Sequence, residues 1–260
     1  MQKKNKILQL KGINVVAFIL TYNSGSMLKK AYSKIPKNLV DLIIVCDDAS
    51  TDNTAKISRG LGLATYSNNI AKGYGGNIKF ALSKAFELGA DFAVEVHGDG
   101  AQFNPMSINQ AIPLMRENYD LILGSRFIIP GSARKNGMPL IRYLANIGLS
   151  FFDRLILRLP LSEFHTGFRI YSRKFYNTLP LNLNSNDYLL SFEIIAQCAY
   201  FDMKVGEIPV EADYLSEHSS HKIGGAILYA FQTFYILFKF ILARSGIFYT
   251  GQFPKKEINA

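Results

Sequence analysis

The stretch Val45-Cys46-Asp47-Asp48-Ala49-Ser50-Thr51-Asp52-Asn53-Thr54 indicates the fold class of this chain. The apolar run from Leu42 to Cys46 predicts a buried strand, and two carboxylates follow it directly. The Ser, Asp, Asn and Thr residues that come next are typical of a turn that starts a helix. Acidic side chains at the carboxyl end of such a strand lie where α/β proteins bind ligands. A solvated turn capped by its own side chains is the alternative interpretation.

Size and composition predict either one large folded domain or one domain with an appendage. The chain has 260 residues, and 48% of them are hydrophobic, which is enough for a full core. The formal net charge of +9 favours an anionic partner, such as a phosphate-bearing substrate or an anionic membrane. The sequence has no long Lys/Arg run, so we expect no nucleic-acid partner. Cys46 and Cys198 lie in apolar segments and are expected to be buried, reduced thiols, as in a cytosolic protein.

Strands and helices are expected to alternate through the first half of the chain. Apolar runs predict strands at residues 15–22, 42–47, 64–67, 92–97 and 121–125. Helical patterns cover residues 26–34, 51–61, 76–88 and 107–118. This alternation predicts an α/β fold with a mostly parallel sheet covered by helices on both faces. The start of the chain imitates a signal peptide, but its short apolar run is better explained as the first buried strand.

Two apolar helices are expected in the second half. Residues 140–159 place Leu140, Leu144 and Ile147 on one face, with arginines interspersed, so this helix either covers the core or lies on a membrane. Residues 223–238 carry no charge, and this run is slightly shorter than the about 20 apolar residues of a spanning helix. We interpret it as a helix at a membrane interface, a buried helix or a dimer contact. The expected division is therefore a domain at 1–222 and an apolar helix with a tail at 223–260.

Polar groups follow the predicted strands in order along the chain. A glycine-rich loop, Lys72-Gly73-Tyr74-Gly75-Gly76-Asn77, precedes a helix and is of a kind that exposes backbone N–H groups to a phosphate. A carboxylate beside an imidazole, as in His97-Gly98-Asp99, suits Mg²⁺ or Mn²⁺ that bridges a diphosphate. Arg126 has a fork suited to phosphate oxygens, although a structural ion pair is the usual case for a single arginine. Because these groups end successive strands, we expect them to share one edge of the sheet.

The ordered set of motifs resembles family 2 glycosyltransferases, and in particular the dolichyl-phosphate or polyprenyl-phosphate mannose (or glucose) synthase-like branch. The motifs are Tyr22-Asn23, Asp47-Asp48-x-Ser50-x-Asp52, Gly75-Gly76-Asn77, His97-Gly98-Asp99, Gly124-Ser125-Arg126 and Thr166-Gly167-Phe168-Arg169. The resemblance covers roughly residues 13–222. It implies a GT-A fold and the inverting transfer of a sugar from a GDP- or UDP-sugar donor to a lipid phosphate.

The resemblance also implies roles for individual residues. The catalytic residues would be Asp99, Arg126, Glu163 and Arg169. The nucleotide sugar would contact Thr21, Tyr22, Asn23, Asp47, Asp48, Gly76, Asn77, His97 and Gly98. The acceptor phosphate would face Arg126, Arg134, Arg142 and Arg169. The metal, Mg²⁺ or Mn²⁺, would bind Asp99 with help from Gln102.

The nature of the acceptor decides whether the reaction needs a base. An ionised lipid phosphate needs none, whereas the hydroxyl of a saccharide or protein does, and Glu163 is then the candidate. A non-catalytic nucleotide-sugar-binding protein is another alternative, because His97 stands where relatives usually carry the first acid of Asp-x-Asp. His218 and His221 have a spacing suggestive of a zinc site, for which a solvated basic loop is the alternative.

We expect the protein to work at a membrane without crossing it. Relatives carry added transmembrane helices, whereas this sequence ends at Ala260, so a peripheral enzyme on the cytoplasmic face of a membrane is expected. The segments 140–159 and 223–244 would meet the membrane surface, and a homodimer is the alternative use of the second segment.

Overall fold

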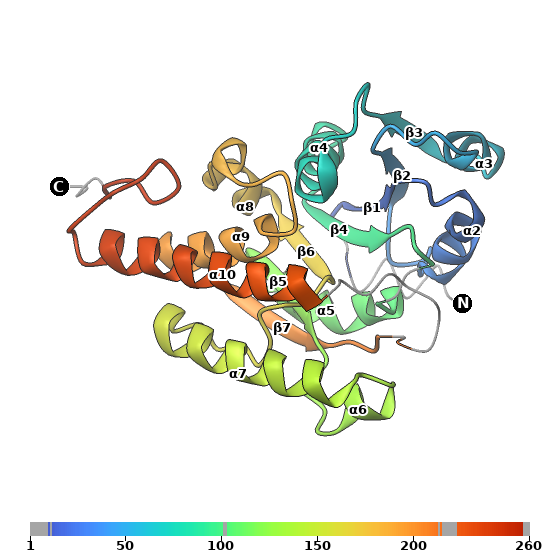
Figure 1. Ribbon diagram of the computed structural model, residues 1–260. Helices are drawn as coiled ribbons and strands as arrows, with labels where there is room; N and C mark the ends of the chain where they lie inside the picture. Colours follow the sequence, from blue (N-terminus) through green and yellow to red (C-terminus); the bar gives the residue numbers. More distant parts are fainter. Residues whose placement is uncertain (1–9, 11, 101–102, 213, 215–222, 257–260) are drawn as a thin grey trace.

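A twisted sheet of seven strands forms the centre of the protein (Figure 1). The computed structural model describes residues 10, 12–100, 103–212, 214 and 223–256. The strands are β1 (Val15–Thr21), β2 (Leu42–Asp47), β3 (Ala64–Ser67), β4 (Phe92–His97), β5 (Leu121–Ser125), β6 (Arg169–Ser172) and β7 (Val205–Pro209). Their order is β3-β2-β1-β4-β6-β5-β7, and every pairing is parallel except those of β6 with β4 and β5. The predicted α/β fold with a mostly parallel sheet is confirmed.

Helices cover both faces of the sheet, because side chains alternate between two cores along each strand. In β1, Val16 and Phe18 face one core and Ala17 and Ile19 face the other. The first core lies under α4 (Gly73–Glu87), α8 (Arg173–Thr178), α9 (Leu190–Tyr200) and α10 (Ile223–Arg244). The second lies under α2 (Gly25–Lys34), α3 (Thr54–Gly60) and α5 (Ile108–Arg116). The remaining short elements are α6 (Ser132–Lys135) and the 3-10 turns η1 (Pro105–Ser107) and η2 (Leu181–Leu183).

The five strands and four helices that are predicted for the first half of the chain are all present, with shifts of a few residues at their ends. The predicted burial of Cys46 and Cys198 is also confirmed. The sequence patterns did not reveal β6, β7, α8 or α9. All eleven residues of α9 are buried, so this helix lacks the polar face that produces a helical pattern. The strand β6 has four residues and begins with an arginine, so no apolar run marks it.

The orientation of β6 brings one more segment to the functional edge of the sheet. The parallel strands β1, β2, β4 and β5 all end at the same edge. Because β6 runs in the opposite direction, it begins at that edge, with Arg169 as its first residue. The residues 162–168 that lead into β6 therefore lie beside the ends of β4 and β5.

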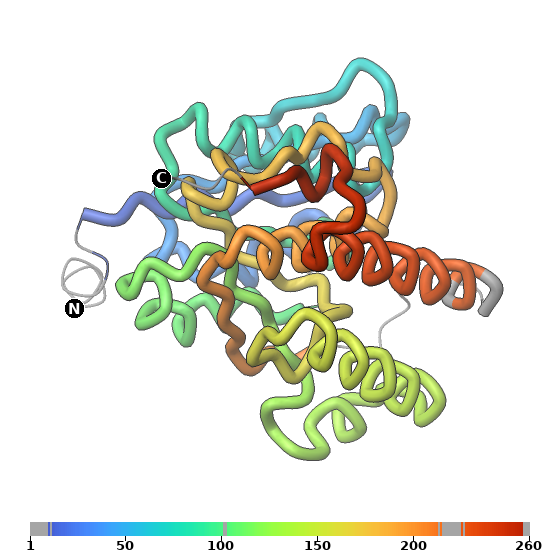
Figure 2. Tube along the Cα trace, turned by 90° about the vertical axis from the view of Figure 1, so that its left-hand side faces the viewer, coloured from blue at the N-terminus to red at the C-terminus, as the bar shows by residue number. Residues whose placement is uncertain are grey.

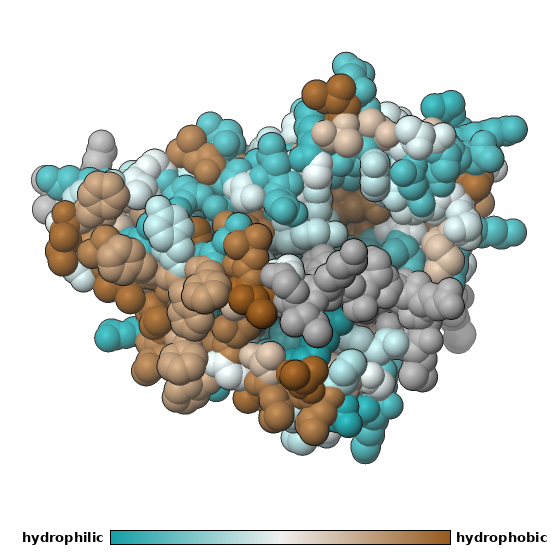
Figure 3. Space-filling model, viewed as in Figure 1, coloured by the Kyte–Doolittle hydropathy of each residue, from teal (hydrophilic) through white to brown (hydrophobic). Residues whose placement is uncertain are grey.

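Two long helices, α7 (Leu140–Leu157) and α10, lie side by side and project from the sheet (Figures 1 and 2). The side chains of Ile236, Leu237 and Phe240 are buried where α10 packs on α9. The window Ile227–Arg244 is long and apolar enough to cross a membrane, and 28% of it is buried. The remaining apolar side chains of both helices form a continuous exposed surface (Figure 3).

Substitution of Gly75 by Ala should destabilise the fold. An added Cβ would lie 2.6 Å from the carbonyl oxygen of Asp187 and 2.8 Å from that of Ser185, so backbone must move. We expect a loss of about 1–3 kcal/mol in the free energy of unfolding, measured by denaturant titration. Gly60→Ala is the matched control, because nothing lies within 4 Å of its added Cβ. An equal effect of the two substitutions would contradict this packing.

Candidate active site at the carboxyl edge of the sheet

The two carboxylates of the acidic loop are buried and already hold several hydrogen bonds. Asp48 accepts from the backbone N–H groups of Lys72 and Gly73, at 2.8 and 2.9 Å, and from Asn68 Nδ2 at 2.9 Å. Asp47 accepts from Thr21 Oγ1 at 2.9 Å and from the backbone N–H of Ser50 at 3.1 Å. Asp47 and Asp48 therefore fix the loops at the ends of β2 and β3, and their contact with a nucleotide stays a prediction.

The glycine-rich loop is shaped by a neighbouring backbone segment. The N–H of Gly76 donates to the carbonyl oxygen of Asn186 at 3.1 Å, and the N–H of Gly73 donates to Asp48. A Cβ on Gly75 would collide with this segment, and one on Gly76 would collide with Lys72. Close packing thus explains the glycines, and the N–H groups of Gly73 and Gly76 already have partners within the chain.

The end of β1 presents one exposed aromatic ring. Asn23 has a positive φ of 48°, and its side-chain oxygen accepts from the N–H of Thr51 at 2.9 Å. Tyr22 is 59% exposed beside this anchored turn. Asn77 is buried and donates to the carbonyl oxygen of Cys46 at 3.0 Å. Of these predicted donor contacts, Tyr22 and Asn23 are exposed, and the Asn23 side chain is anchored to the turn at Thr51, whereas Asn77 is buried.

A buried carboxylate, Glu95, organises the end of β4. It accepts hydrogen bonds from the hydroxyls of Tyr74 and Tyr171, at 2.7 and 2.6 Å, and lies 3.0 Å from His97 Nε2. Burial lowers the pKa of His97, but the hydrogen bond to Glu95 and the charges of Glu95 and Asp99 outweigh burial and raise that pKa. The sequence analysis gave Glu95 no role of its own, although a charged residue within the apolar run 92–96 is a signal of a functional position.

Asp99 lies just beyond β4 and has one oxygen suited to a cation. Its Oδ1 is buried without a hydrogen-bond partner in the described part of the chain. Gly98 brings the loop close to β1, where a Cβ would lie 2.6 Å from the carbonyl oxygen of Leu20. Among the described residues no three His, Cys, Asp or Glu side chains are grouped as metal ligands. Gln102 and the histidines at 218 and 221 lie outside the described residues.

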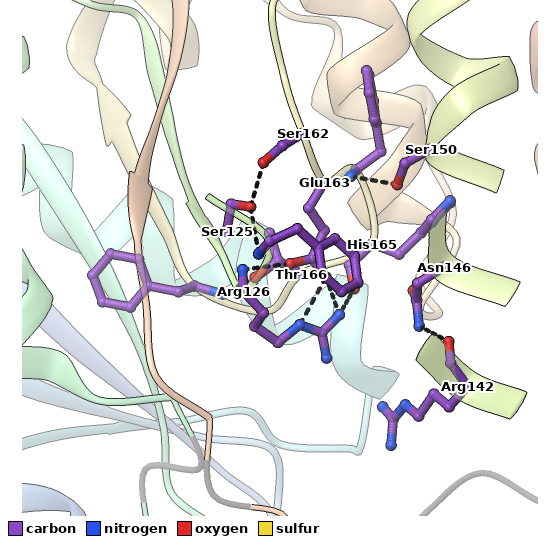
Figure 4. Close-up of polar contacts among 12 residues, drawn as sticks. Ser125, Arg126, Arg142, Asn146, Ser150, Ser162, Glu163, His165 and Thr166 are labelled. Atoms are coloured by element: carbon purple, nitrogen blue, oxygen red, sulfur yellow. Dashed lines mark hydrogen bonds and ion pairs between the residues drawn. The ribbon is translucent and has the colours of Figure 1, made fainter. Parts of the chain in front are cut away.

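Arg126 and Glu163 form a buried ion pair at the end of β5 (Figure 4). Arg126 donates to the Glu163 carboxylate from its backbone N–H at 2.7 Å, from Nε at 2.8 Å and from Nη2. Burial lowers the pKa of the Arg126 guanidinium, but the adjacent charge of Glu163 outweighs burial and raises it. The Glu163 side chain is fully buried. This pair is the structural alternative that the sequence left open for Arg126.

Two of the four predicted acceptor arginines meet around Tyr214. The Tyr214 hydroxyl accepts from Arg126 Nη1, and the Arg142 guanidinium lies 5.3 Å from the centre of the Tyr214 ring. Arg134 instead donates to the carbonyl oxygen of Met138 and closes its own loop. Arg169 is enclosed, 4.0 Å from Glu95, and its Nε and Nη1 have no hydrogen-bond partner among residues 10–256 that are described.

The comparison with known protein families agrees with this arrangement. The model of the family described as "Glycosyl transferase family 2" matches residues 16–179. This chain belongs to glycosyl transferase family 2. The transferase is 30% identical, over 241 residues, to "UDP-N-acetylglucosamine--dolichyl-phosphate N-acetylglucosaminyltransferase" of Methanococcus voltae. That match covers 86% of this chain and 94% of the relative.

Other relatives support the same grouping. The "Dolichyl-phosphate hexose transferase" of Haloferax volcanii is 26% identical over 168 residues, which are 64% of this chain and 68% of the relative. The crystal structure of glucosyl-3-phosphoglycerate synthase from Mycobacterium tuberculosis with uridine diphosphate superposes with a TM-score of 0.69 at 17% identity. The superposition covers 95% of this chain and 86% of that one, which confirms the predicted GT-A fold.

A cavity of about 220 Å³ adjoins Arg126 in the transferase. Its lining comes from the end of β5, the loop before α6, the residues around η1 and the end of β7. The residues that line it are Asn104, Met106, Ser107, Gln110, Ser125, Arg126, Ile129, Ser132, Pro209, Val210 and Glu211. Arg126 thus lies next to a space large enough for a small polar group.

Replacement of Glu163 by Gln should cost the transferase about 3–5 kcal/mol of unfolding free energy. The amide would leave a buried guanidinium without its counter-charge, and chemical denaturation measures the loss. The control is Glu207→Gln, because Glu207 accepts from the N–H and hydroxyl of Ser162 and burial raises its pKa. An amide oxygen keeps that acceptor role, so we expect a cost below about 1 kcal/mol. Similar losses in both variants would show that the ion pair has no special role.

Proposed function

We propose that this protein is an inverting glycosyltransferase that moves a sugar from a nucleotide-diphosphate donor to a polyprenyl or dolichyl phosphate. The observation that carries the proposal is the pairing of Glu163 with Arg126. The Glu163 carboxylate is fully buried, and both of its oxygens already accept hydrogen bonds from Arg126. Glu163, the candidate base for a hydroxyl acceptor, is therefore already bound to Arg126, which favours an acceptor that is already ionised.

The arginines near Tyr214 suit such an acceptor. Arg126 makes four side-chain hydrogen bonds with the described residues, and a guanidinium has five N–H donors, so within that part of the chain one N–H of Nη1 remains for a phosphate oxygen. The Arg142 guanidinium lies 5.3 Å from the centre of the Tyr214 ring, and Arg142 is exposed. Two guanidinium groups can hold a phosphate monoester in line with the donor sugar without a proton transfer. The names of the archaeal relatives agree with a dolichyl-phosphate acceptor.

Asp99 is the residue that we assign to a divalent cation. Its Oδ1, which has no hydrogen-bond partner among the described residues, offers one oxygen ligand, and a donor diphosphate and water supply the others in sites of this kind. Mg²⁺ or Mn²⁺ bound there would offset the charge that the leaving diphosphate gains. The M. voltae relative is named for a UDP-activated sugar, so UDP-N-acetylglucosamine is the first donor to test, before GDP-sugars.

The apolar surface of α7 and α10 is proposed to rest on the cytoplasmic face of a membrane that carries the lipid acceptor. Its exposed side chains are Leu140, Ile141, Leu144, Ile147, Phe151, Phe152 and Leu155 of α7, and Ile227, Leu228, Phe231, Phe234, Tyr235 and Phe238 of α10. The rings of Phe152 and Phe234 contact each other and join the two helices. Arginines along α7 and the net charge of +9 favour anionic lipids. Because the other side of α10 packs on α9, we propose an interfacial helix.

The reaction is tested with purified protein, a panel of UDP- and GDP-sugars, Mn²⁺ or Mg²⁺ and a short polyprenyl phosphate. Mass spectrometry should detect a polyprenyl-phosphate sugar from the wild type, and chelation of the metal should abolish it. Asp99→Asn should lower the rate by about 100-fold or more, because a cation ligand is lost. Asp91→Asn is the matched control, since Asp91 precedes β4 at the opposite edge of the sheet. Donor binding without consumption would instead indicate a binding protein.

Membrane association is tested by flotation with vesicles of phosphatidylcholine and phosphatidylglycerol. The double variant Ile141→Ser and Phe231→Ser removes side chains that are 82% and 70% exposed, one on each helix. We expect at least about tenfold weaker binding, since burial of each side chain is worth about 1.5–3 kcal/mol. Ile70→Ser is the control, because Ile70 is 73% exposed on the connection between β3 and α4. Unchanged flotation of the double variant would refute this surface as the contact.

A further inference from the structure

One side chain, His165, joins the three helices that carry or support the apolar surface. Its Nε2 lies 2.9 Å from Asp153 Oδ2 on α7, and its Nδ1 lies 3.2 Å from the Tyr229 hydroxyl on α10. Its ring stacks on Phe192 of α9, with ring centres 5.6 Å apart. Both nitrogens of the imidazole and one face of the ring are therefore used to connect helices.

The backbone of the same residue contacts the reaction site. The carbonyl oxygen of His165 accepts from Arg126 Nη2 at 3.1 Å, two residues along from the Glu163 that pairs with that arginine (Figure 4). The intervening residue, Phe164, donates its N–H to Ser150 Oγ on α7 at 3.3 Å. Residues 163–165 thus connect α7 and α10 on one side with the guanidinium of Arg126 on the other.

Burial of the Asp153 carboxylate costs free energy, and a side chain that served packing alone would avoid this cost. It is 1% exposed, and burial raises its pKa even though His165 is beside it. A buried ionisable pair commonly stabilises a fold no more than apolar side chains of the same shape would. What such a pair does provide is a fixed orientation, because its hydrogen bonds are satisfied in one geometry.

We propose that His165 is a positioning residue, held by Asp153 and Tyr229, that sets the orientation of Arg126 toward the acceptor phosphate. The inference rests on the proposed function, since it concerns the acceptor half of that reaction. Helices seated on the lipid surface would thereby fix the guanidinium that receives the lipid headgroup. The side chain of His165 contacts Asp153, Tyr229 and Phe192, so we expect its loss to leave the loops that follow β1 and β2 intact.

The test measures kcat and KM for polyprenyl phosphate, together with the dissociation constant of the nucleoside diphosphate. His165→Phe keeps a ring against Phe192 but removes both hydrogen bonds, and we expect kcat to fall by about tenfold or more. His165→Gln can still donate to Asp153 and should recover most of that loss. The dissociation constant of the nucleoside diphosphate should change by less than about twofold in both variants. A general loss of folded protein would weaken nucleotide binding as well, so this measurement distinguishes the two cases.

If His165→Phe does not fold, Tyr229→Phe provides a second test of the same link. It removes only the contact with α10 and should lower kcat by about threefold or more. Tyr200→Phe is its matched control, because Tyr200 also donates a hydroxyl hydrogen bond near α10, to Pro254, away from Arg126. Wild-type kcat in both His165→Phe and Tyr229→Phe, with glycolipid formed, overturns the inference alone. A wild type that forms no glycolipid overturns the proposed function, and the inference with it.

Discussion

A guanidinium and a carboxylate, Arg126 and Glu163, are buried together at the end of β5, and each makes the burial of the other tolerable. Arg126 follows a strand, whereas Glu163 belongs to the segment that leads into β6, so the pair ties two distant parts of the chain to one point. It fixes a cation beside a cavity of about 220 Å³. It also withdraws from solvent the carboxylate that a hydroxyl acceptor would have needed. A single contact therefore shapes the site and favours an ionised acceptor.

The antiparallel strand β6 makes this contact feasible. In a wholly parallel sheet, a strand at this position would begin at the far edge, about 15 Å away over its length of four to five residues. Reversal of β6 instead places residues 162–169 beside His97 and Arg126. The same segment touches α7 and α10 through His165, so the carboxyl edge of the sheet and the apolar surface of the two helices share a boundary. This arrangement suits a reaction between a water-soluble donor and a lipid.

Much of the fold could be predicted from the sequence because its signals are local. The run 42–46 followed by acids marks β2, and the alternation of apolar runs with helical patterns marks the parallel part of the sheet. Long-range pairs could not be predicted in this way. Arg126 and Glu163 are 37 residues apart, and the residues around each of them contain no pattern that indicates the other as its partner. The glycines of 73–76 were interpreted as a phosphate cradle, yet Asn186 packs against them. Glu95 lies within an apolar run, and its charge is the feature that distinguishes it from its neighbours in the sequence.

The central claim is that the acceptor arrives already ionised and that this protein supplies no base to it. The most direct measurement compares two acceptors of equal chain length, a polyprenyl phosphate and the corresponding neutral polyprenol, with the same nucleotide sugar and metal. We predict glycolipid from the phosphate and none from the alcohol. Efficient transfer to the polyprenol, with no product from the phosphate, would contradict the account and would require a base that Glu163 cannot provide while it is bound to Arg126.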